Sequence, residues 1–315
     1  MTKIDLITGF LGSGKTTFIT EYVKYLISKG EKVCILENDY GAVNVDMMLI
    51  SDLRGENCEI EMVSGGCDID CHRRRFKTKL IAMGMSGYTR VIVEPSGVFD
   101  VDEFFDALYE SPLDNWYEIG NVITVLDGDL PDELSEESDY VLASQASFAG
   151  KIIISKTGII SPEKVEASVQ HLKNALKMIK CDRDITDSLV FKDWSAYDDT
   201  DFEMIMRAGY RQERFIKRQI MEDNAYSSKY FMNLSLSPEE IVELAEKIFR
   251  DEEVGHVLRI KGFAKDGEGW KLINSTRGKN TVESIENGQD VIIVIGENIN
   301  EEKISSCYFK NTMVS

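Results

Sequence analysis

The sequence predicts a doubly wound α/β domain with a mostly parallel sheet, followed by a small α+β domain. Between residues 4 and 178, apolar strands alternate with helical segments, as in βαβ folds. Several of these strands are nearly continuous apolar runs, which is typical of parallel strands that are buried on both faces. After about residue 222 the pattern changes to closely spaced strands suited to antiparallel hairpins. We therefore expect domains at residues 1–222 and 223–315.

The elements of the first domain are predicted from hydrophobic periodicity and from helix start signals. The expected strands are residues 4–8, 32–37, 59–63, 90–94, 121–127 and 151–155. The expected helices are residues 17–28, 73–85, 102–109 and 162–178. The last helix has the clearest start, with Ser161 as N-cap and Pro162 at the first helical position. Residues 182–227 are polar with scattered aromatic side chains, and we expect them to lead into the second domain.

The second domain shows a different order of elements. Its expected strands are residues 230–234, 256–263, 270–274 and 291–295. Its expected helices are residues 237–249 and 301–307, the first capped by Ser237-Pro238. Strands with hairpin spacing and only two helices indicate an α+β domain.

The stretch from Gly9 to Thr17 has the spacing G-x-x-x-x-G-K-[ST] between a predicted strand and a predicted helix. In that context the loop turns its backbone N–H groups inward and forms a phosphate site, so the domain is expected to be a P-loop NTPase domain. Lys15 would reach the β- and γ-phosphates, and the Thr16 hydroxyl would ligate Mg²⁺. The expected nucleotide-binding residues of this loop are Gly9, Gly12, Ser13, Gly14, Lys15, Thr16 and Thr17.

Further candidates follow other buried strands, where ligands collect at the carboxyl edge of such a sheet. Glu94 ends one strand, where a carboxylate would hold Mg²⁺ directly or through water, and the Gly97 amide would meet the γ-phosphate. Asp39 follows the second strand and is the candidate catalytic switch carboxylate, with Glu37 as its nearest competitor. Lys15 and Glu94 complete the catalytic set.

Composition limits the classes of partner. The chain has 315 residues and a formal net charge of −19, which argues against nucleic acid as a partner, because phosphate backbones need a basic face. No apolar run approaches the length of a membrane span, and no signal-peptide pattern precedes the first strand. We expect a cytoplasmic protein with no membrane contact.

These motifs together resemble the CobW-like family of metal-associated P-loop GTPases. The shared motifs include Gly9–Thr17, Asn38-Asp39-Tyr40-Gly41, Gly66-Cys67, Glu94-Pro95-Ser96-Gly97, Ser155-Lys156-Thr157 and Leu258–Phe263. The resemblance implies GTP hydrolysis coupled to metal delivery or insertion, commonly of zinc or cobalt. It also implies base contacts from Ser155 and Lys156, and a small C-terminal domain that engages a client metalloprotein.

The sequence departs from the family pattern at two places. The metal motif, usually Gly-Cys-x-Cys-Cys, reads Gly66-Cys67-Asp68-Ile69-Asp70-Cys71-His72, and the base-reading motif has Gly158 in place of its aspartate. Weaker base reading makes ATP a competitor of GTP and predicts that Gly158→Asp raises the preference for GTP.

Two cysteines and a histidine nevertheless form a ligand set suited to zinc, with Cys67, Cys71 and His72 as the candidate ligands. The competing interpretation is two reduced cysteines in a switch loop, with His72 as a helix cap. His171 and His256 are expected to be structural or exposed.

Three functions follow from these patterns. The first is a GTP-hydrolysing switch that delivers or inserts a metal or metallocofactor into a client protein. The second is an ATP- or GTP-dependent chaperone or activator of a corrinoid or other metalloenzyme, without metal binding of its own. A small-molecule kinase would fit the phosphate loop but not the Glu94–Gly97 and Lys156 motifs, and product analysis separates it from the other two.

Overall fold

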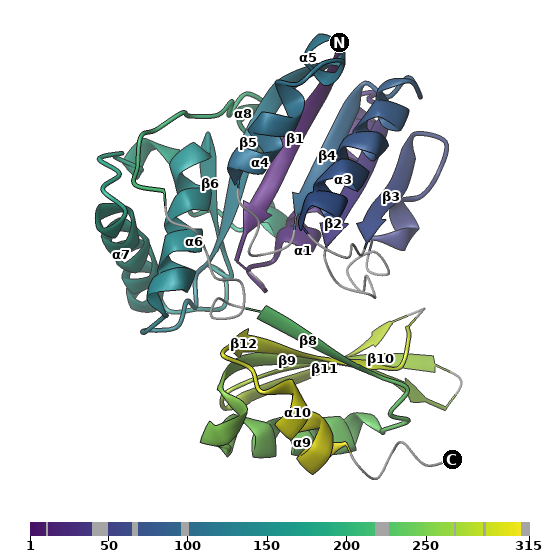
Figure 1. The fold of residues 1–315 in the computed structure, drawn as a ribbon, viewed down its shortest axis with the longest axis vertical. Helices are drawn as coiled ribbons and strands as arrows, with labels where there is room; N and C mark the ends of the chain where they lie inside the picture. The colour runs from purple at the N-terminus through teal and green to yellow at the C-terminus, as the bar shows by residue number, and fades with distance from the viewer. Residues whose placement is uncertain are drawn as a thin grey trace. The chain divides into compact units, whose positions relative to one another are not determined.

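The computed structural model of this chain divides into two compact units, Met1–Gln219 and Ile220–Ser315 (Figure 1). The structure describes residues 1–10, 12–39, 50–64, 69–95, 101–217, 227–267, 269–285 and 288–309. The expected domain boundary at residue 222 lies outside these ranges. Within the described ranges, no helix is long and apolar enough to span a bilayer.

The first unit is built on a seven-stranded sheet with the strand order β3-β2-β4-β1-β5-β6-β7. Every neighbouring pair recorded in this sheet is parallel, which confirms the predicted α/β class. The strands are β1 Thr2–Gly9, β2 Val33–Asp39, β3 Cys58–Ser64, β4 Arg90–Pro95, β5 Tyr117–Asp127, β6 Lys151–Ser155 and β7 Leu189–Val190. β4 is buried along its whole length, as a central parallel strand between two helical layers must be.

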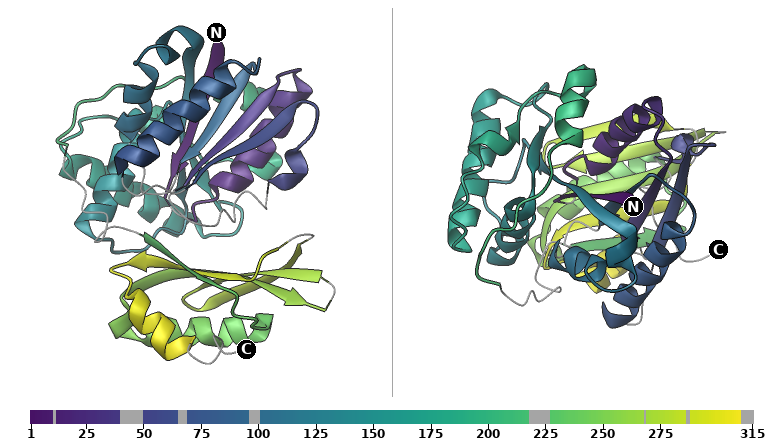
Figure 2. Two further views of the ribbon diagram at one scale, coloured as in Figure 1. Left: turned by 45° about the vertical axis from the view of Figure 1, so that its right-hand side comes forward. Right: turned by 90° about the horizontal axis from the view of Figure 1, so that it is seen from above.

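Helices cover both faces of this sheet (Figures 1 and 2). The helices are α1 Lys15–Ser28, α3 Ile69–Gly84, α4 Val101–Leu108, α5 Leu113–Trp116, α6 Glu136–Phe148, α7 Pro162–Met178 and α8 Asp199–Met206. Leu6 of β1 packs into a core with α3 and α4, whereas its neighbour Ile7 packs with α1 and α8. The alternation follows from the two-residue side-chain period of a strand.

The second unit is a five-stranded sheet with the order β11-β10-β9-β12-β8, and its recorded pairs are antiparallel. The strands are β8 Ser227–Met232, β9 His256–Asp266, β10 Gly269–Thr276, β11 Lys279–Ile285 and β12 Val291–Glu297. The helices are α9 Pro238–Arg250 and α10 Glu301–Tyr308, and both contribute to the core of this unit (Figure 1). The predicted α+β architecture is confirmed.

The predicted helix starts at Ser161 and Ser237 are confirmed by their hydrogen bonds. Ser161 caps α7 by accepting from the Lys164 amide, and Ser237 forms a capping box with Glu240 on α9. A serine N-cap followed by proline is a local signal, because the hydroxyl satisfies an amide that the helix leaves unpaired. Such starts are therefore readable without knowledge of the tertiary structure.

Several elements differ from the prediction. α3 begins at Ile69, not at Arg73, so Cys71 and His72 lie in the first turns of a helix instead of a preceding loop. β11 was missed because most of its side chains are exposed, so this edge strand has no apolar face to reveal it. The polar segment after residue 182 contains β7 and α8, two short elements with weak periodicity.

Candidate phosphate site

The loop between β1 and α1 contains three described glycines with a positive φ, and the requirement for glycine is clearest at Gly9 and Gly14. Gly9 has a φ of 143°, and a Cβ placed on it would lie 2.3 Å from the Val125 carbonyl oxygen. Gly14, the N-cap of α1, has a φ of 100° in the left-handed region. Glycine adopts these angles without strain, and its small size lets the backbone approach closely. The loop thus reaches the N-terminus of α1, whose first amides are available to an anion.

Ser13 and Lys15 line this loop. The Ser13 side chain is fully buried, and its hydroxyl finds no hydrogen-bond partner among the described residues. Lys15 is 7% exposed, and its ammonium lies 3.1 Å from the Gly9 carbonyl oxygen and 3.4 Å from that of Phe10. An ammonium has three donors, so Lys15 retains one for a phosphate oxygen. A buried hydroxyl and a loop-bound cation fit an anionic ligand.

Thr16 and Glu94 meet at the same edge of the sheet. The Thr16 hydroxyl donates a hydrogen bond of 3.1 Å to Glu94 Oε1, and Glu94 is 4% exposed near the end of β4. The β2–β4 pairing places Glu37, 3% exposed, directly beside Glu94. These are hard oxygen donors, which suit Mg²⁺, an ion that keeps several of its waters. The residues present therefore fit the expected Mg²⁺, and Thr16 and Glu94 remain its predicted protein ligands.

Other predicted residues of the phosphate site are described only in part. Gly12 has a φ of 80°, and Thr17 is exposed in the first turn of α1. Asp39 is the last residue of β2, and the position of its carboxylate lies outside the description. Gly97 lies outside the described residues altogether. The roles assigned to Asp39 and Gly97 remain predictions.

Ser155 is the last residue of β6, and Lys156 follows it. A Cβ placed on Gly14 would lie 3.7 Å from Ser155 Cβ, so the end of β6 borders the loop. Lys156 has a φ of 61°, and its ammonium lies 2.5 Å from Asp127 Oδ2 at the end of β5. Asp127 was not predicted from the sequence, although it ends a buried strand just as Glu94 does. That shared position was the signal that could have identified it.

The candidate transition-metal ligands are described in part. Cys67 lies outside the described residues, and Cys71 is half-buried on α3. His72 is 1% exposed, and its Nε2 lies 2.7 Å from Asn38 Oδ1 at the end of β2. The amide oxygen only accepts, so Nε2 carries the proton and Nδ1 is the nitrogen suited to a metal. Among the described residues, no three His, Cys, Asp or Glu side chains gather into a metal-binding group.

Two other cysteines have a structural role. Cys34 and Cys58 are buried in the two cores on either side of the sheet. Burial raises the pKa of the Cys34 thiol to about 12 and that of Cys58 to about 11. Both thiols stay protonated at neutral pH, and a metal is bound by the thiolate. They are core residues.

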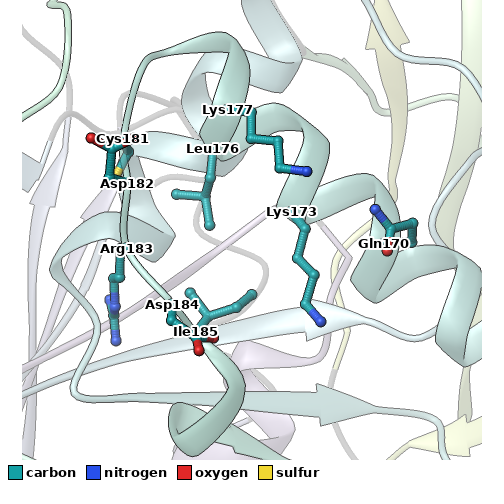
Figure 3. Close-up of a pocket in the computed structure, with 9 residues that line it drawn as sticks. All are labelled: Gln170, Lys173, Leu176, Lys177, Cys181, Asp182, Arg183, Asp184 and Ile185. Atoms are coloured by element: carbon teal, nitrogen blue, oxygen red, sulfur yellow. The ribbon is translucent and has the colours of Figure 1, made fainter.

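A hollow of about 390 Å³ lies beside α7, away from the phosphate loop (Figure 3). Lys173 and Lys177 line it together with Arg183. The Arg183 guanidinium donates to backbone carbonyls at the end of α6, including that of Ser147 at 3.1 Å, and to the Ser188 hydroxyl at 2.8 Å. These bonds hold the chain after α7 against α6. We interpret the hollow as a consequence of this packing.

Comparison with known proteins gives one family and several relatives. The family model described as "CobW/HypB/UreG, nucleotide-binding domain" matches residues 3–187. The zinc chaperone YeiR of Escherichia coli is 28% identical over 168 residues, which are 53% of this chain and 50% of YeiR. Zinc-regulated GTPase metalloprotein activator 1 of Dictyostelium discoideum is 23% identical over 83% of this chain and 62% of its own length.

One solved structure has similar coverage of both chains. The crystal structure of Zn(II)-bound YjiA GTPase from E. coli has a TM-score of 0.40 and 20% identity, and covers 97% of each chain. The chain spans about half the length of YeiR and about three fifths of the Dictyostelium protein.

Proposed function

Because the chain belongs to the CobW/HypB/UreG family of nucleotide-binding domains, we propose that it is a cytoplasmic, GTP-hydrolysing switch. In this proposal it delivers a metal or metallocofactor to a client metalloprotein, which the second unit engages. The observation that carries the proposal is the meeting of Thr16 and Glu94 beside the glycine loop and Lys15. This arrangement joins a phosphate site to an oxygen-rich cation site. The family membership agrees with the resemblance drawn from the motifs.

The residues of the loop have separate tasks in the proposed hydrolysis. Loop amides and the Lys15 ammonium hold the β- and γ-phosphates and stabilise the charge that develops as water attacks in line. Thr16 and Glu94 hold Mg²⁺, which when bound neutralises charge on the phosphate oxygens. Asp39 is proposed to sense the γ-phosphate from the end of β2.

The metal is proposed to be cargo, and zinc is the first candidate. YeiR is named a zinc chaperone, and the zinc-regulated activator of Dictyostelium is named a GTPase. Cys67, Cys71 and His72 are the proposed ligands, with cobalt as the alternative metal. Asn38 would orient His72 by accepting its Nε2–H, a contact that ligating histidines usually make to an outer group.

A second candidate is a nucleotide-dependent chaperone or activator of a corrinoid or other metalloenzyme that binds no metal itself. The observation that favours it is the burial of His72 against Asn38. A 1% exposed imidazole with this partner also serves simply as a packing and hydrogen-bonding residue at the start of α3. The altered cysteine spacing is compatible with this role.

Hydrolysis is tested by phosphate release from GTP and ATP with Mg²⁺. Lys15→Ala should abolish release, whereas Lys24→Ala should not, because Lys24 is an exposed residue of α1 paired with Glu21. Release of inorganic phosphate without a phosphorylated acceptor supports the switch. Normal hydrolysis by Lys15→Ala would overturn the assignment of this loop.

Metal binding is tested by zinc and cobalt titration of wild type, Cys67→Ser/Cys71→Ser and Asn38→Ala, each with GDP and with GTP. Cys307→Ser is the matched control, since Cys307 is exposed on α10. The metal-delivery proposal expects tight binding by wild type and the control, none by the double variant, and affinity about 10- to 100-fold weaker in Asn38→Ala. No binding by wild type supports the second candidate.

A further inference from the structure

Gly158 and Asp193 lie side by side although they come from different loops. A Cβ placed on Gly158 would lie 3.3 Å from Asp193 Oδ2 and 3.9 Å from Asp193 Cγ. Gly158 belongs to the turn that follows β6, and Asp193 belongs to the loop that follows β7. Since β6 and β7 are parallel neighbours, both loops leave the same edge of the sheet. The Asp193 carboxylate therefore occupies the space that a side chain at position 158 would enter.

The same loop also borders the phosphate site. A Cβ placed on Gly14 would lie 2.9 Å from Trp194 Cη2, so the Trp194 ring lies directly against the loop that precedes α1. Two exposed apolar side chains accompany these loops, Ile159 at 71% and Phe191 at 50% exposed. A heterocycle attached to phosphates in the glycine loop would thus find a carboxylate and apolar side chains on this side.

The Asp193 carboxylate has a fixed orientation. Its Oδ1 accepts from the Ser195 amide at 2.9 Å and from the Ser195 hydroxyl at 2.5 Å, which caps the short helix Trp194–Ala196. Among the described residues, no hydrogen bond or ion pair is recorded for Oδ2, the oxygen turned toward Gly158. The helix cap accounts for the hydrogen bonds of Oδ1, and it leaves the lone pairs of Oδ2 available to hydrogen-bond donors of a ligand.

We propose that Asp193 is the base-reading carboxylate of this protein and selects guanine over adenine; this inference rests on the proposed nucleotide function. Guanine presents two adjacent donors, the ring N1–H and the exocyclic amine. Adenine presents an acceptor, N1, at the corresponding ring position. A carboxylate oxygen accepts hydrogen bonds from the guanine N1–H and amine but repels the lone pair of adenine N1. A site built on such hydrogen bonds discriminates strongly between the two bases. Asp193 is thus a specificity residue placed on a neighbouring loop.

This geometry changes the expectation for Gly158→Asp. The backbone at Gly158 accepts a side chain, because its φ lies outside the left-handed region. The new carboxylate would, however, be placed against Asp193 Oδ2, and two like charges in contact destabilise each other. The single substitution should therefore lower GTP affinity. The exchange Gly158→Asp/Asp193→Ser should restore the preference for GTP, since serine still caps the short helix.

The inference is tested by competition binding of GTP, ATP and xanthosine triphosphate with Mg²⁺. Xanthine keeps N1–H but carries a carbonyl in place of the amine, so an amide at position 193 suits it better than a carboxylate does. Asp193→Asn keeps the Oδ1 cap and should lower the affinity for GTP roughly 10- to 100-fold. It should raise the affinity for xanthosine triphosphate and leave the affinity for ATP unchanged. Asp198→Asn is the matched control, because Asp198 caps α8 through its Oδ1 in the same way.

The outcomes separate this inference from the proposed function. The inference is supported if Asp193→Asn prefers xanthosine triphosphate to GTP while Asp198→Asn binds like wild type. It is also supported if Gly158→Asp/Asp193→Ser regains the selectivity for GTP that Asp193→Ser alone has lost. The inference is overturned if wild type binds GTP and ATP with equal affinity, or if the ratio of the two affinities is unchanged in both Asp193 variants. Neither outcome contradicts the proposed nucleotide hydrolysis. Wild type that binds no nucleotide overturns the proposed function and this inference with it.

Discussion

The Thr16 hydroxyl donates to Glu94 Oε1 across 3.1 Å, which joins the first turn of α1 to the end of β4. Each residue was selected separately from the sequence, one by loop spacing and the other by its place after an apolar strand. Their contact means that the two proposed Mg²⁺ ligands are already within reach of one ion. Little rearrangement of the protein would then be needed when the nucleotide and Mg²⁺ bind.

Glu94→Gln tests this cation site. The amide keeps the shape and the hydrogen bond from Thr16 but removes the charge, so we expect kcat for GTP hydrolysis to fall about 10²-fold, and the Mg²⁺ concentration for half-maximal activity to rise. Phosphate release measured over a Mg²⁺ titration checks both. Glu118→Gln is the control, an exposed carboxylate at the opposite end of the sheet. Equal Mg²⁺ dependence in wild type and Glu94→Gln would contradict the assignment.

Gly9→Ala tests the backbone of the glycine loop. A Cβ there would lie 2.3 Å from the Val125 carbonyl oxygen, and the backbone, unlike a side-chain end, cannot move aside cheaply. Gly87→Ala is the matched control, since Gly87 also has a positive φ, 74°, but has no atom within 4 Å of such a Cβ. We expect Gly87→Ala to lower the free energy of unfolding by about 1–2 kcal/mol, because alanine is strained at this positive φ.

Gly9→Ala should cost about 1–3 kcal/mol more than Gly87→Ala, through overpacking. It should also lose nucleotide affinity, which Gly87→Ala keeps. Urea unfolding and GTP binding measure the two effects. Equal losses of stability in the two variants would show that the contact with Val125 is unimportant.

The sequence was sufficient where the signal is local. The alternation of buried strands and helices, the glycine loop and the serine caps each depend on a few consecutive residues. The sequence was insufficient where contacts between distant segments determine the structure. The proximity of Asp193 to Gly158 depends on the pairing of β6 with β7, and β7 has only two residues, too few to show periodicity. α3 was expected to begin at the Arg73–Arg75 charge run, yet the backbone is helical from Ile69, where an acidic residue in the first turn is favourable.

A buried ion pair in the first unit predicts a large loss of stability. Asp5 Oδ2 lies 2.6 Å from the Arg90 guanidinium and accepts from the Tyr22 hydroxyl at 2.9 Å, and all three residues are at most 1% exposed. Asp5→Ala leaves the buried arginine charge with only Glu31, whose Oε1 lies 3.9 Å from the guanidinium, so it should lower the free energy of unfolding by about 3–5 kcal/mol.

The replacement of both charges by apolar side chains, Asp5→Leu/Arg90→Met, should cost less than Asp5→Ala, because no uncompensated charge remains. Glu21→Ala breaks an exposed pair with Lys24 and should cost less than about 1 kcal/mol. Urea unfolding of the variants checks this order. A double variant as unstable as Asp5→Ala would show that lost packing, not the loss of Asp5 as partner of the arginine charge, sets the loss of stability.

The contact between α6 and α7 predicts a pH-dependent contribution to stability. His171 Nε2 lies 2.7 Å from Asp139 Oδ1, and this hydrogen bond raises the pKa of His171 above its usual range, against the opposing effect of burial. A histidine whose pKa is higher in the folded than in the unfolded chain stabilises the fold fully below its unfolded pKa, about 6.5. That contribution is lost as the pH rises through the folded pKa.

His171→Gln should therefore lower the free energy of unfolding more at about pH 5.5 than at about pH 8.5. Asp139→Asn should show the same trend, since it removes the partner that raises the pKa of His171. Urea unfolding of both variants and of wild type at the two pH values measures the difference. Glu21→Gln, which alters an exposed pair on α1, controls for general charge effects. A deficit in His171→Gln that is equal at both pH values would mean that the imidazole contributes through packing alone.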